Sequence, residues 1–204
     1  MDQRTKLFTF AAAGMMFGAC SVARGAAIFT ESTDAGQLLP TATPLPAGID
    51  RIHGALNPEG DIDLYRFILG TDTTFNVSIL TPAGPGGIGF DTDTTIFDAQ
   101  GHPLAVFDPP SFSLPLSAGA YYLAIADWNV AATNAAGQMI ADDYYNIFIP
   151  EAVLGGWVAT SSPERGGPYE ITFSAVTIPE PAPALLMAAP AFLAMRRKRS
   201  RQIA

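Results

Sequence analysis

Cysteine is almost absent from this sequence: of its 204 residues only Cys20 is a cysteine, and it directly follows the apolar stretch near the N-terminus. If the chain is cleaved after Cys20, the mature protein has no cysteine and forms no disulfide bond. Proteins outside the cytoplasm can use disulfide bonds, but this fold has to rest on its hydrophobic core. Residues 28–177 make one domain by length, long enough to bury roughly 68–70 % of the surface of the unfolded chain.

Basic residues are scarce between positions 28 and 177, where only Arg51, Arg66 and Arg165 occur. The same segment holds 17 of the 19 acidic residues, so its formal charge is −14, whereas the whole chain carries −8. A domain of this charge repels nucleic acid and anionic lipid and attracts cations. Nucleic acid is therefore not expected as a partner, and the charge could equally serve only the solubility of an exported protein.

Motifs of known catalytic sites are also missing. The only two histidines, His53 and His102, have no metal-ligand spacing to a partner, and no His-Glu-x-x-His occurs. The sequence has no Gly-x-Ser-x-Gly and no phosphate-binding loop, and nothing selects one pair of aspartates as an acid and a base. We therefore predict that the protein is not an enzyme, and that both histidines lie at strand ends or in turns.

No sustained helical period occurs between the two ends of the chain, where short Val-, Ile-, Phe-, Tyr- and Thr-rich runs alternate with turn residues. This pattern predicts an all-β fold, a jelly-roll-like β-sandwich of about eight to nine strands. Residues 61–69 are apolar on both faces and are expected as a central strand, whereas 111–116 is bounded by prolines and is expected at an edge. Loops are expected at 129–142 and at Gly156-Trp157-Val158. The predicted strands are 49–56, 61–69, 75–79, 94–98, 104–107, 111–116, 120–128, 144–149 and 169–176.

The N-terminus has the charge, length and position of a secretory signal peptide. Arg4 and Lys6 precede an apolar stretch at 7–19, and we assign 1–27 to this signal helix. An N-terminal membrane helix and a lipoprotein signal with a lipidated Cys20 are the alternatives. Candidate cleavage sites with small residues lie after Ala23, Gly25 or Ala27.

The last segment of the chain, 178–204, is a proline-rich motif followed by an apolar run at 184–195 and a basic cluster. As a helix the apolar run would span roughly 18 Å, less than the hydrocarbon core of about 30 Å. Pro190 also removes one helical hydrogen bond, and the basic cluster is expected to stay in the cytoplasm. A temporary anchor that is later cleaved and a short permanent anchor both fit this pattern. The basic stop consists of Arg196, Arg197, Lys198, Arg199 and Arg201.

Pro179, Glu180 and Pro181, with the short hydrophobic helix and the Arg-rich end that come after them, resemble the PEP-CTERM sorting signal of Gram-negative bacteria. The resemblance implies export, a transient tether in the inner membrane and processing by an exosortase-type membrane protease. Many members have Gly in the hydrophobic run, where this chain has Ala188-Ala189-Pro190. The protein would end in the cell envelope or outside the cell, either free or attached to exopolysaccharide or another matrix polymer.

Three motifs within residues 49–176 resemble the bacterial pre-peptidase C-terminal domain. The resemblance implies a jelly-roll-like accessory module of the kind appended to secreted proteases, and some of its relatives bind calcium or polymers such as collagen. No peptidase precedes the motifs in this sequence, so the accessory role is expected to stand alone. The motifs are Asp61-Ile-Asp-Leu-Tyr-Arg-Phe67, Asp91-Thr-Asp-Thr-Thr-Ile-Phe-Asp-Ala-Gln-Gly101 and Leu116-Ser-Ala-Gly-Ala-Tyr-Tyr-Leu-Ala-Ile125.

Five aspartates are candidate calcium ligands, because calcium binds several hard oxygen atoms that carboxylates on adjoining segments can supply. In a strand Asp61 and Asp63 point to the same face, so one cation could bridge them. Asp91 and Asp93 stand just before a strand and could do likewise, with Asp98 as a further candidate. The spacing is not that of an EF-hand. The alternative is that these are solvated aspartates that cap turns.

Five aromatic residues are candidates for a carbohydrate site, because sugar rings stack on exposed aromatic faces. Aromatic side chains are also common fillers of a β core. The residues are Trp128, Trp157, Tyr144, Tyr145 and Tyr169.

Together these features predict an exported, non-catalytic protein of the cell envelope or extracellular matrix. The alternative is a calcium-dependent module that binds a polysaccharide or a protein. Calcium is the only cofactor that the sequence suggests.

Overall fold

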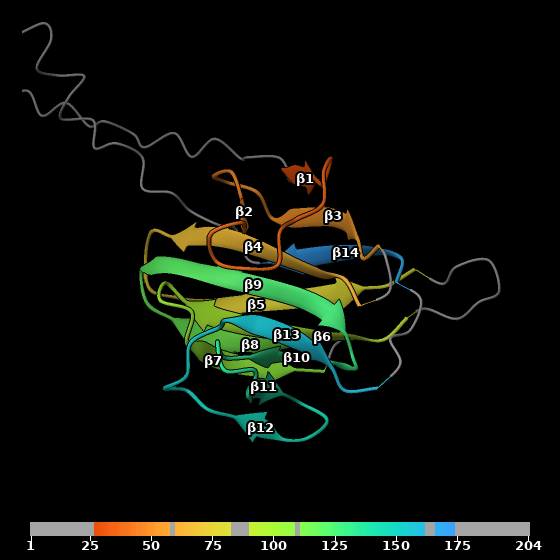
Figure 1. The fold of residues 1–204 in the computed structure, drawn as a ribbon. Coiled ribbons are helices and arrows are strands. Elements are labelled where there is room, and N and C mark those ends of the chain that lie inside the picture. Colours follow the sequence, from red (N-terminus) through yellow and green to blue (C-terminus); the bar gives the residue numbers. More distant parts are fainter. Residues whose placement is uncertain (1–26, 58–59, 83–89, 109–110, 162–165, 174–204) are drawn as a thin grey trace, which may run out of the picture.

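The computed structural model describes residues 27–57, 60–82, 90–108, 111–161 and 166–173. These residues form fourteen strands in three sheets and no helix (Figure 1). Within these ranges there is accordingly no helix long and apolar enough to cross a membrane. The strands are β1 (Ile28–Thr30), β2 (Thr43–Pro44), β3 (Arg51–Ala55), β4 (Ile62–Leu69), β5 (Thr73–Leu80), β6 (Thr92–Asp98), β7 (Pro103–Phe107), β8 (Ser111–Leu116), β9 (Gly119–Asp127), β10 (Val130–Thr133), β11 (Met139–Asp142), β12 (Ile147–Phe148), β13 (Gly156–Ala159) and β14 (Pro168–Phe173).

The first sheet contains five strands in the order β1-β3-β14-β5-β8. β1 pairs with β3 in parallel, and all other pairs in this sheet are antiparallel. In β5 the buried residues Phe75, Val77 and Ile79 alternate with exposed positions, so this strand buries only one face. β8 lies at the edge of the sheet, which confirms the prediction from its flanking prolines.

The second sheet also contains five strands, in the order β2-β4-β9-β6-β7. β4 and β9 pair over eight positions, from Ile62 opposite Ala126 to Leu69 opposite Gly119. β4, β6 and β9 are buried over most of their length. One face of this sheet packs against the first sheet and forms a core that includes Ile52, Tyr65, Phe67, Phe75, Leu123 and Ile171.

The third sheet contains four strands in the order β12-β11-β10-β13 and covers the other face of the second sheet. A second core joins Leu64, Phe97 and Ala124 of the second sheet to Val130 and Ile140 of the third. In Figure 1, β11 and β12 lie at the lower end of the molecule, beyond β7. The second sheet is thus the middle of three layers, which explains why its strands are apolar on both faces.

The third sheet is the part of the fold that the sequence did not reveal. Residues 129–142 were expected to be a long loop, but they contain β10 and β11, and every residue of β10 is buried. Gly156-Trp157-Val158 lies in β13 and not in a loop. The strand expected at 144–149 is a turn followed by the short β12. Small residues such as Ala131 and Ala132 give no β signal, although both are buried in β10.

The all-β class and the sandwich are confirmed, with a third layer added to the two that were expected. The central position of β4 is also confirmed. Residues 1–26 of the signal peptide predicted at 1–27, and the whole C-terminal segment at 178–204, lie outside the described residues.

Candidate cation-binding sites

Three carboxylate side chains converge where the loop after β1 crosses the start of β4. Glu31 and Asp34 come from the loop and Asp63 comes from the strand. One ligand oxygen of each lies within 4.8 Å of the others. Asp34 is exposed, Glu31 is half-buried and Asp63 is fully buried, so the group runs from the surface into the core. We call Glu31, Asp34 and Asp63 the β4 carboxylate cluster.

Asp63 is the innermost member, and only one of its two oxygens has a hydrogen-bond donor. The Tyr169 hydroxyl donates to Oδ2 over 2.6 Å, and the Tyr65 hydroxyl lies 2.7 Å from that of Tyr169. Asp63 Oδ1 is buried and has no hydrogen-bond partner. Buried polar atoms are paired in nearly all proteins, so this unpaired carboxylate oxygen next to two further carboxylates is a candidate ligand for a cation.

The charge of Asp63 is poorly tolerated in the absence of a cation. Burial is the main reason that its pKa rises to about 8, and the hydrogen bond from Tyr169 opposes this shift. The negative charges of Glu31, Asp61 and Asp34 raise the pKa of Asp63 further. A bound cation would reverse these effects, because it replaces lost hydration and neutralises the neighbouring charges.

Backbone contacts fix the loop that carries Glu31 and Asp34. Glu31 Oε1 accepts a hydrogen bond from the N–H of Ala35 at 2.6 Å, and Oε2 accepts one from the N–H of Ala55 at 3.1 Å. Gly54 lies opposite Tyr169 in the β3–β14 pair, and a side chain there would collide with the Tyr169 hydroxyl and with Glu31. Glycine at this position therefore leaves the space in which the cluster assembles.

Asp61 lies beside the cluster, and both of its oxygens already accept hydrogen bonds. Its Oδ2 accepts from the N–H of Asn57 at 2.8 Å, and its Oδ1 accepts from its neighbour Ile62 at 2.9 Å and from Gln37 Nε2 at 3.3 Å. It caps the turn before β4, but it is buried and is therefore not the solvated aspartate that the alternative expected. Partial burial and then the charge of Asp61 raise the pKa of the nearby Asp34.

Glu31 and Asp34 were not predicted as site residues. They reach Asp63 because β1 pairs with β3 and because the N–H of Leu64 donates to the carbonyl of Gly36 over 3.2 Å. These contacts join residues 23 and 28 positions apart, and their register is not visible in the sequence. The only local signal is a pair of acidic residues in a short polar loop.

The residues present fit calcium better than a softer metal. The cluster offers carboxylate oxygens only, and calcium binds such hard ligands from flexible segments. Across the described ranges no arginine or histidine forms an ion pair with Glu31, Asp34 or Asp63. The charge of the cluster is therefore not neutralised by the protein in the part of the chain that is described.

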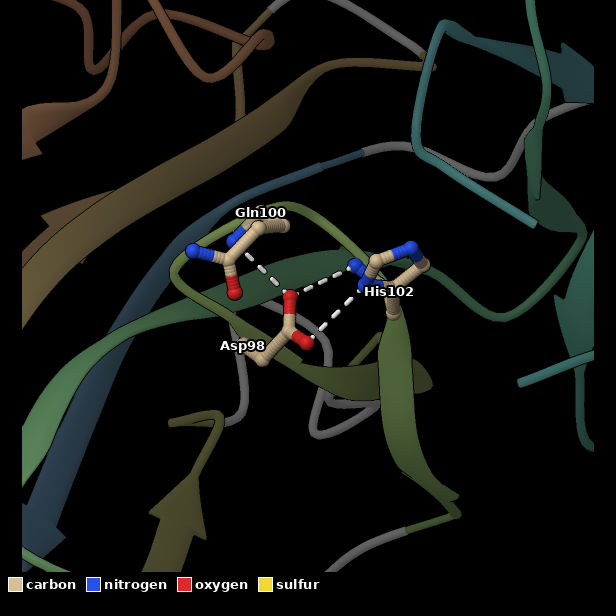
Figure 2. A network of polar contacts seen from close by, with 3 residues as sticks. All are labelled: Asp98, Gln100 and His102. Carbon is tan, nitrogen blue, oxygen red and sulfur yellow. Dashed lines mark hydrogen bonds and ion pairs between the residues drawn. The ribbon is translucent and has the colours of Figure 1, made fainter. Parts of the chain in front are cut away.

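Asp98 holds the turn between β6 and β7 (Figure 2). It lies at the opposite end of β6 from Asp91 and Asp93. Its Oδ1 accepts from the N–H groups of Gln100 at 2.8 Å and His102 at 2.9 Å, and its Oδ2 lies 2.9 Å from His102 Nδ1. Burial alone would raise the pKa of Asp98, but these contacts with His102 and Gln100 outweigh it and lower the pKa. Gly101 adopts the positive φ of 90° that the turn requires.

The two histidines occupy different places. His102 lies in the turn before β7, as predicted. His53 lies in the middle of β3 and not at a strand end, and its Nε2 is 2.9 Å from Oε2 of Glu170 on β14. Arg51 approaches the other oxygen of Glu170 at 3.4 Å, so this group ties the two strands together.

Asp91 and Asp93 line a second acidic region, a pocket of about 370 Å³. The pocket residues that the structure describes are Asp91, Asp93, Asp108, Trp128, Asp143 and Tyr144, and we call them the acidic pocket. These carboxylates do not form a compact three-ligand group like the β4 carboxylate cluster. Asp108 and Asp143 were not predicted, because they come from turns after β7 and β11.

The five predicted aromatic residues divide between the core and the surface. Tyr169 is buried, and Trp157 packs edge-on against Phe97 with its ring centroid 6.2 Å away. Trp128, Tyr144 and Tyr145 instead form a chain of edge-to-face contacts beside the acidic pocket.

Comparisons with known proteins add no family assignment. No family model matches the chain, and no curated protein matches it. Among solved structures it is similar to the pre-peptidase C-terminal domain of collagenase from Bacillus anthracis, at 14 % identity and a TM-score of 0.38, over 65 % of this chain and 93 % of that one. It is also similar to PliG of Aeromonas hydrophila, a periplasmic inhibitor of g-type lysozyme, at 14 % identity and a TM-score of 0.37, over 74 % and 100 % of the two chains. Because both TM-scores are below 0.5, the function of this chain has to be inferred from its own residues.

Proposed function

We propose that the protein is an exported, non-catalytic module of the cell envelope or extracellular matrix whose β-sandwich binds a calcium ion at the β4 carboxylate cluster. One observation carries the calcium site: Asp63 Oδ1 is fully buried without a hydrogen-bond partner, and Glu31 and Asp34 stand beside it. Glu31, Asp34 and Asp63 would hold the ion.

Calcium at this position would stabilise the folded state. It would tie the loop of Glu31 and Asp34 to β4 and remove the repulsion among three carboxylates. A ligand that binds only the folded state stabilises it by about 2.7 kcal/mol at 100 times its dissociation constant. For a domain of this size that corresponds to a rise in Tm of roughly 5–10 °C. A loop fixed in this way gives a binding surface whose shape depends on calcium.

The test is thermal unfolding of the full chain with calcium and with EGTA. We expect calcium to raise the Tm of the wild type and of Glu151→Gln, which removes an exposed charge outside the cluster. We expect Asp34→Asn, which changes an exposed cluster residue, to lose most of the shift. Equal shifts in all three proteins, or no shift in the wild type, would contradict the calcium site.

A non-catalytic role is supported by the places of the two histidines. His53 pairs with Glu170 on an outer sheet, and His102 pairs with Asp98 in a turn. Neither stands next to a serine or cysteine nucleophile in any hydrogen bond among the described residues. His53 instead links β3 to β14, and His102 holds the turn between β6 and β7.

Export and sorting rest on the two ends of the chain. We propose that the signal at 1–27 directs export and that an exosortase-type protease processes the chain at Pro179, Glu180 and Pro181. The inner membrane would hold the protein only transiently, and exopolysaccharide or another matrix polymer would be its partner. Intact-mass analysis of the protein from its native host tests this proposal. A C-terminus near Pro181 supports processing, and a chain that still ends at Ala204 contradicts it.

A further inference from the structure

The acidic pocket is assembled at one end of the second and third sheets. Asp91 and Asp93 lie at the start of β6, which pairs with the end of β9, where Trp128 follows. The start of β6 also pairs with the end of β7, and Asp108 comes directly after that strand. Asp143 and Tyr144 follow β11 of the third sheet. The pairing of these strands therefore brings the side chains together at one end of the two sheets.

The pocket concentrates negative charge without a compensating base. None of its described lining residues is Lys, Arg or His. Asp142 adds a further buried carboxylate next to it, and Asp142 Oδ2 has no hydrogen-bond partner. A pocket of this composition attracts a cation.

Asp93 is the residue that points most directly to a ligand. It lines the pocket but is only 7 % exposed, and no hydrogen bond to its carboxylate is found among the described residues. Burial raises its pKa to about 8, with further contributions from Asp142, Asp143, Asp108 and Asp91. A buried carboxylate without a donor is costly unless a positive group pairs with it.

The dimensions of the pocket argue against a bare metal ion. Its carboxylates do not bring three ligand atoms within 4.8 Å of one another, whereas the β4 carboxylate cluster does. Its volume of about 370 Å³ lies at the lower end of the range for small organic ligands. The spread of the charges and the room between them suit a cation that carries carbon atoms.

Two aromatic rings complete this environment. The centroids of Trp128 and Tyr144 are 5.7 Å apart with an angle of 70° between the ring planes, and Tyr145 packs on Tyr144 at 89°. Ring faces set at such angles contact an alkylated nitrogen from two sides, and an aromatic face attracts a cation through its quadrupole.

We propose that the acidic pocket binds an organic ammonium group, with Asp93 pairing with its charge and the rings of Trp128 and Tyr144 contacting the carbon atoms around the nitrogen. This site is separate from the β4 carboxylate cluster and does not require calcium. The ammonium group can belong to a quaternary amine or to an amino sugar, and the two are distinguished experimentally.

The experiment measures binding of four small probes to the full chain by calorimetry and ligand-observed NMR, in EGTA. Choline is compared with its neutral isostere 3,3-dimethylbutan-1-ol, and glucosamine is compared with N-acetylglucosamine. We expect at least one cation to bind and both neutral compounds to fail. Preference for choline identifies a quaternary amine, and preference for glucosamine identifies an amino sugar.

Surface variants then locate the site without disturbing the core. Tyr144 is 69 % exposed, and Asp108 and Asp143 are exposed, so Tyr144→Ala and the double variant Asp108→Asn/Asp143→Asn should fold. We expect each to weaken binding about three- to thirtyfold. Phe148→Ala, which removes a 44 % exposed ring of the same sheet outside the pocket, should bind like the wild type.

Several results would overturn the proposal. These are equal binding of a cation and its neutral partner, no binding of either cation, and binding that the Tyr144 and Asp108/Asp143 variants leave unchanged. Calcium binding that Asp108→Asn/Asp143→Asn abolishes would also overturn it, because the pocket would then be a metal site. Asp34→Asn should leave ammonium binding unchanged. Failure of the ammonium proposal is therefore distinguishable from failure of the proposed calcium site.

Discussion

At the scale of single residues, Asp63 and Asp93 are both carboxylates whose negative charge is costly where they lie. Each is a buried aspartate of the second sheet whose pKa is raised to about 8, mainly by burial. Their surroundings differ, because Asp63 accepts a hydrogen bond from Tyr169 and stands in a compact carboxylate cluster, whereas Asp93 lines a wider pocket with aromatic walls. The two therefore suit cations of different size.

The Tyr169 hydroxyl is expected to stabilise the fold through Asp63. Tyr169→Phe removes the donor to a fully buried carboxylate and should lower the free energy of unfolding by about 1–3 kcal/mol, measured with urea in EGTA. Tyr121→Phe is the matched control, because the Tyr121 hydroxyl donates to the backbone carbonyl of Ser117 and is closer to solvent. If Tyr169→Phe lowers the free energy of unfolding no more than Tyr121→Phe does, the hydrogen bond to Asp63 contributes no more than an ordinary one.

Asp93 is expected to make stability depend on pH. Its pKa is about 8 when folded, against the ordinary 3.8, so between these values the folded state holds a proton that the unfolded state releases. The stability from this proton is complete below about pH 4, falls by up to about 1.4 kcal/mol per pH unit, and is lost above pH 8. Asp93→Asn cannot ionise, so its advantage over the wild type should grow between pH 6 and pH 8.

Urea unfolding at several pH values checks this expectation, with Glu151→Gln as a control for the loss of an exposed charge. A difference between Asp93→Asn and the wild type that stays constant with pH would mean that Asp93 is ionised in the folded protein throughout this range.

At the scale of elements, the sequence indicated strands where large β-formers alternate or run together and missed them where the residues are small. β5 and β9 show the clear patterns, and both were predicted within two residues of their bounds. β10 consists of Val-Ala-Ala-Thr and carries little intrinsic preference. It becomes a strand because β9, β11 and β13 surround it, which is tertiary information.

The candidate sites, too, were predicted only in part from the sequence. Asp61, Asp63, Asp91, Asp93 and Asp98 were predicted from local spacing. Asp98 has local partners, but the groups that surround Asp63 and Asp93 come from distant segments. Glu31, which follows β1 of the first sheet, meets Asp63 on β4 of the second, and Asp143, which follows β11 of the third sheet, lies near Asp93 of the second. No spacing rule contains those contacts, so the sequence could name ligands without saying which of them meet.

The third sheet is expected to contribute to stability as a core layer. Ile140 on β11 is fully buried in the second core, so Ile140→Ala should lower the free energy of unfolding by about 2–5 kcal/mol. Phe148→Ala on β12 is the control, since Phe148 is 44 % exposed and should cost far less. If urea unfolding shows equally small losses of stability for both variants, the third sheet is only a surface covering and not a core layer.

At the scale of the whole molecule, negative charge is the dominant property of residues 28–177. The described sheets bury several of these charges, among them Asp61, Asp63, Asp93 and Asp142. Asp63 and Asp93 pair with no base among the described residues, and they are the charges that the proposed cations would neutralise. Calcium binding at the β4 carboxylate cluster is therefore the property on which the proposed function depends.

Calorimetric titration of calcium into the EGTA-treated and dialysed full chain is the decisive test of this site. The two buried aspartates give matched variants, Asp63→Asn in the cluster and Asp93→Asn in the acidic pocket, and circular dichroism confirms that each is folded. We predict that the wild type and Asp93→Asn bind one calcium ion per chain, and that Asp63→Asn binds at least about tenfold more weakly. Calcium binding that is absent from the wild type, or that folded Asp63→Asn retains unchanged, would contradict the proposed site.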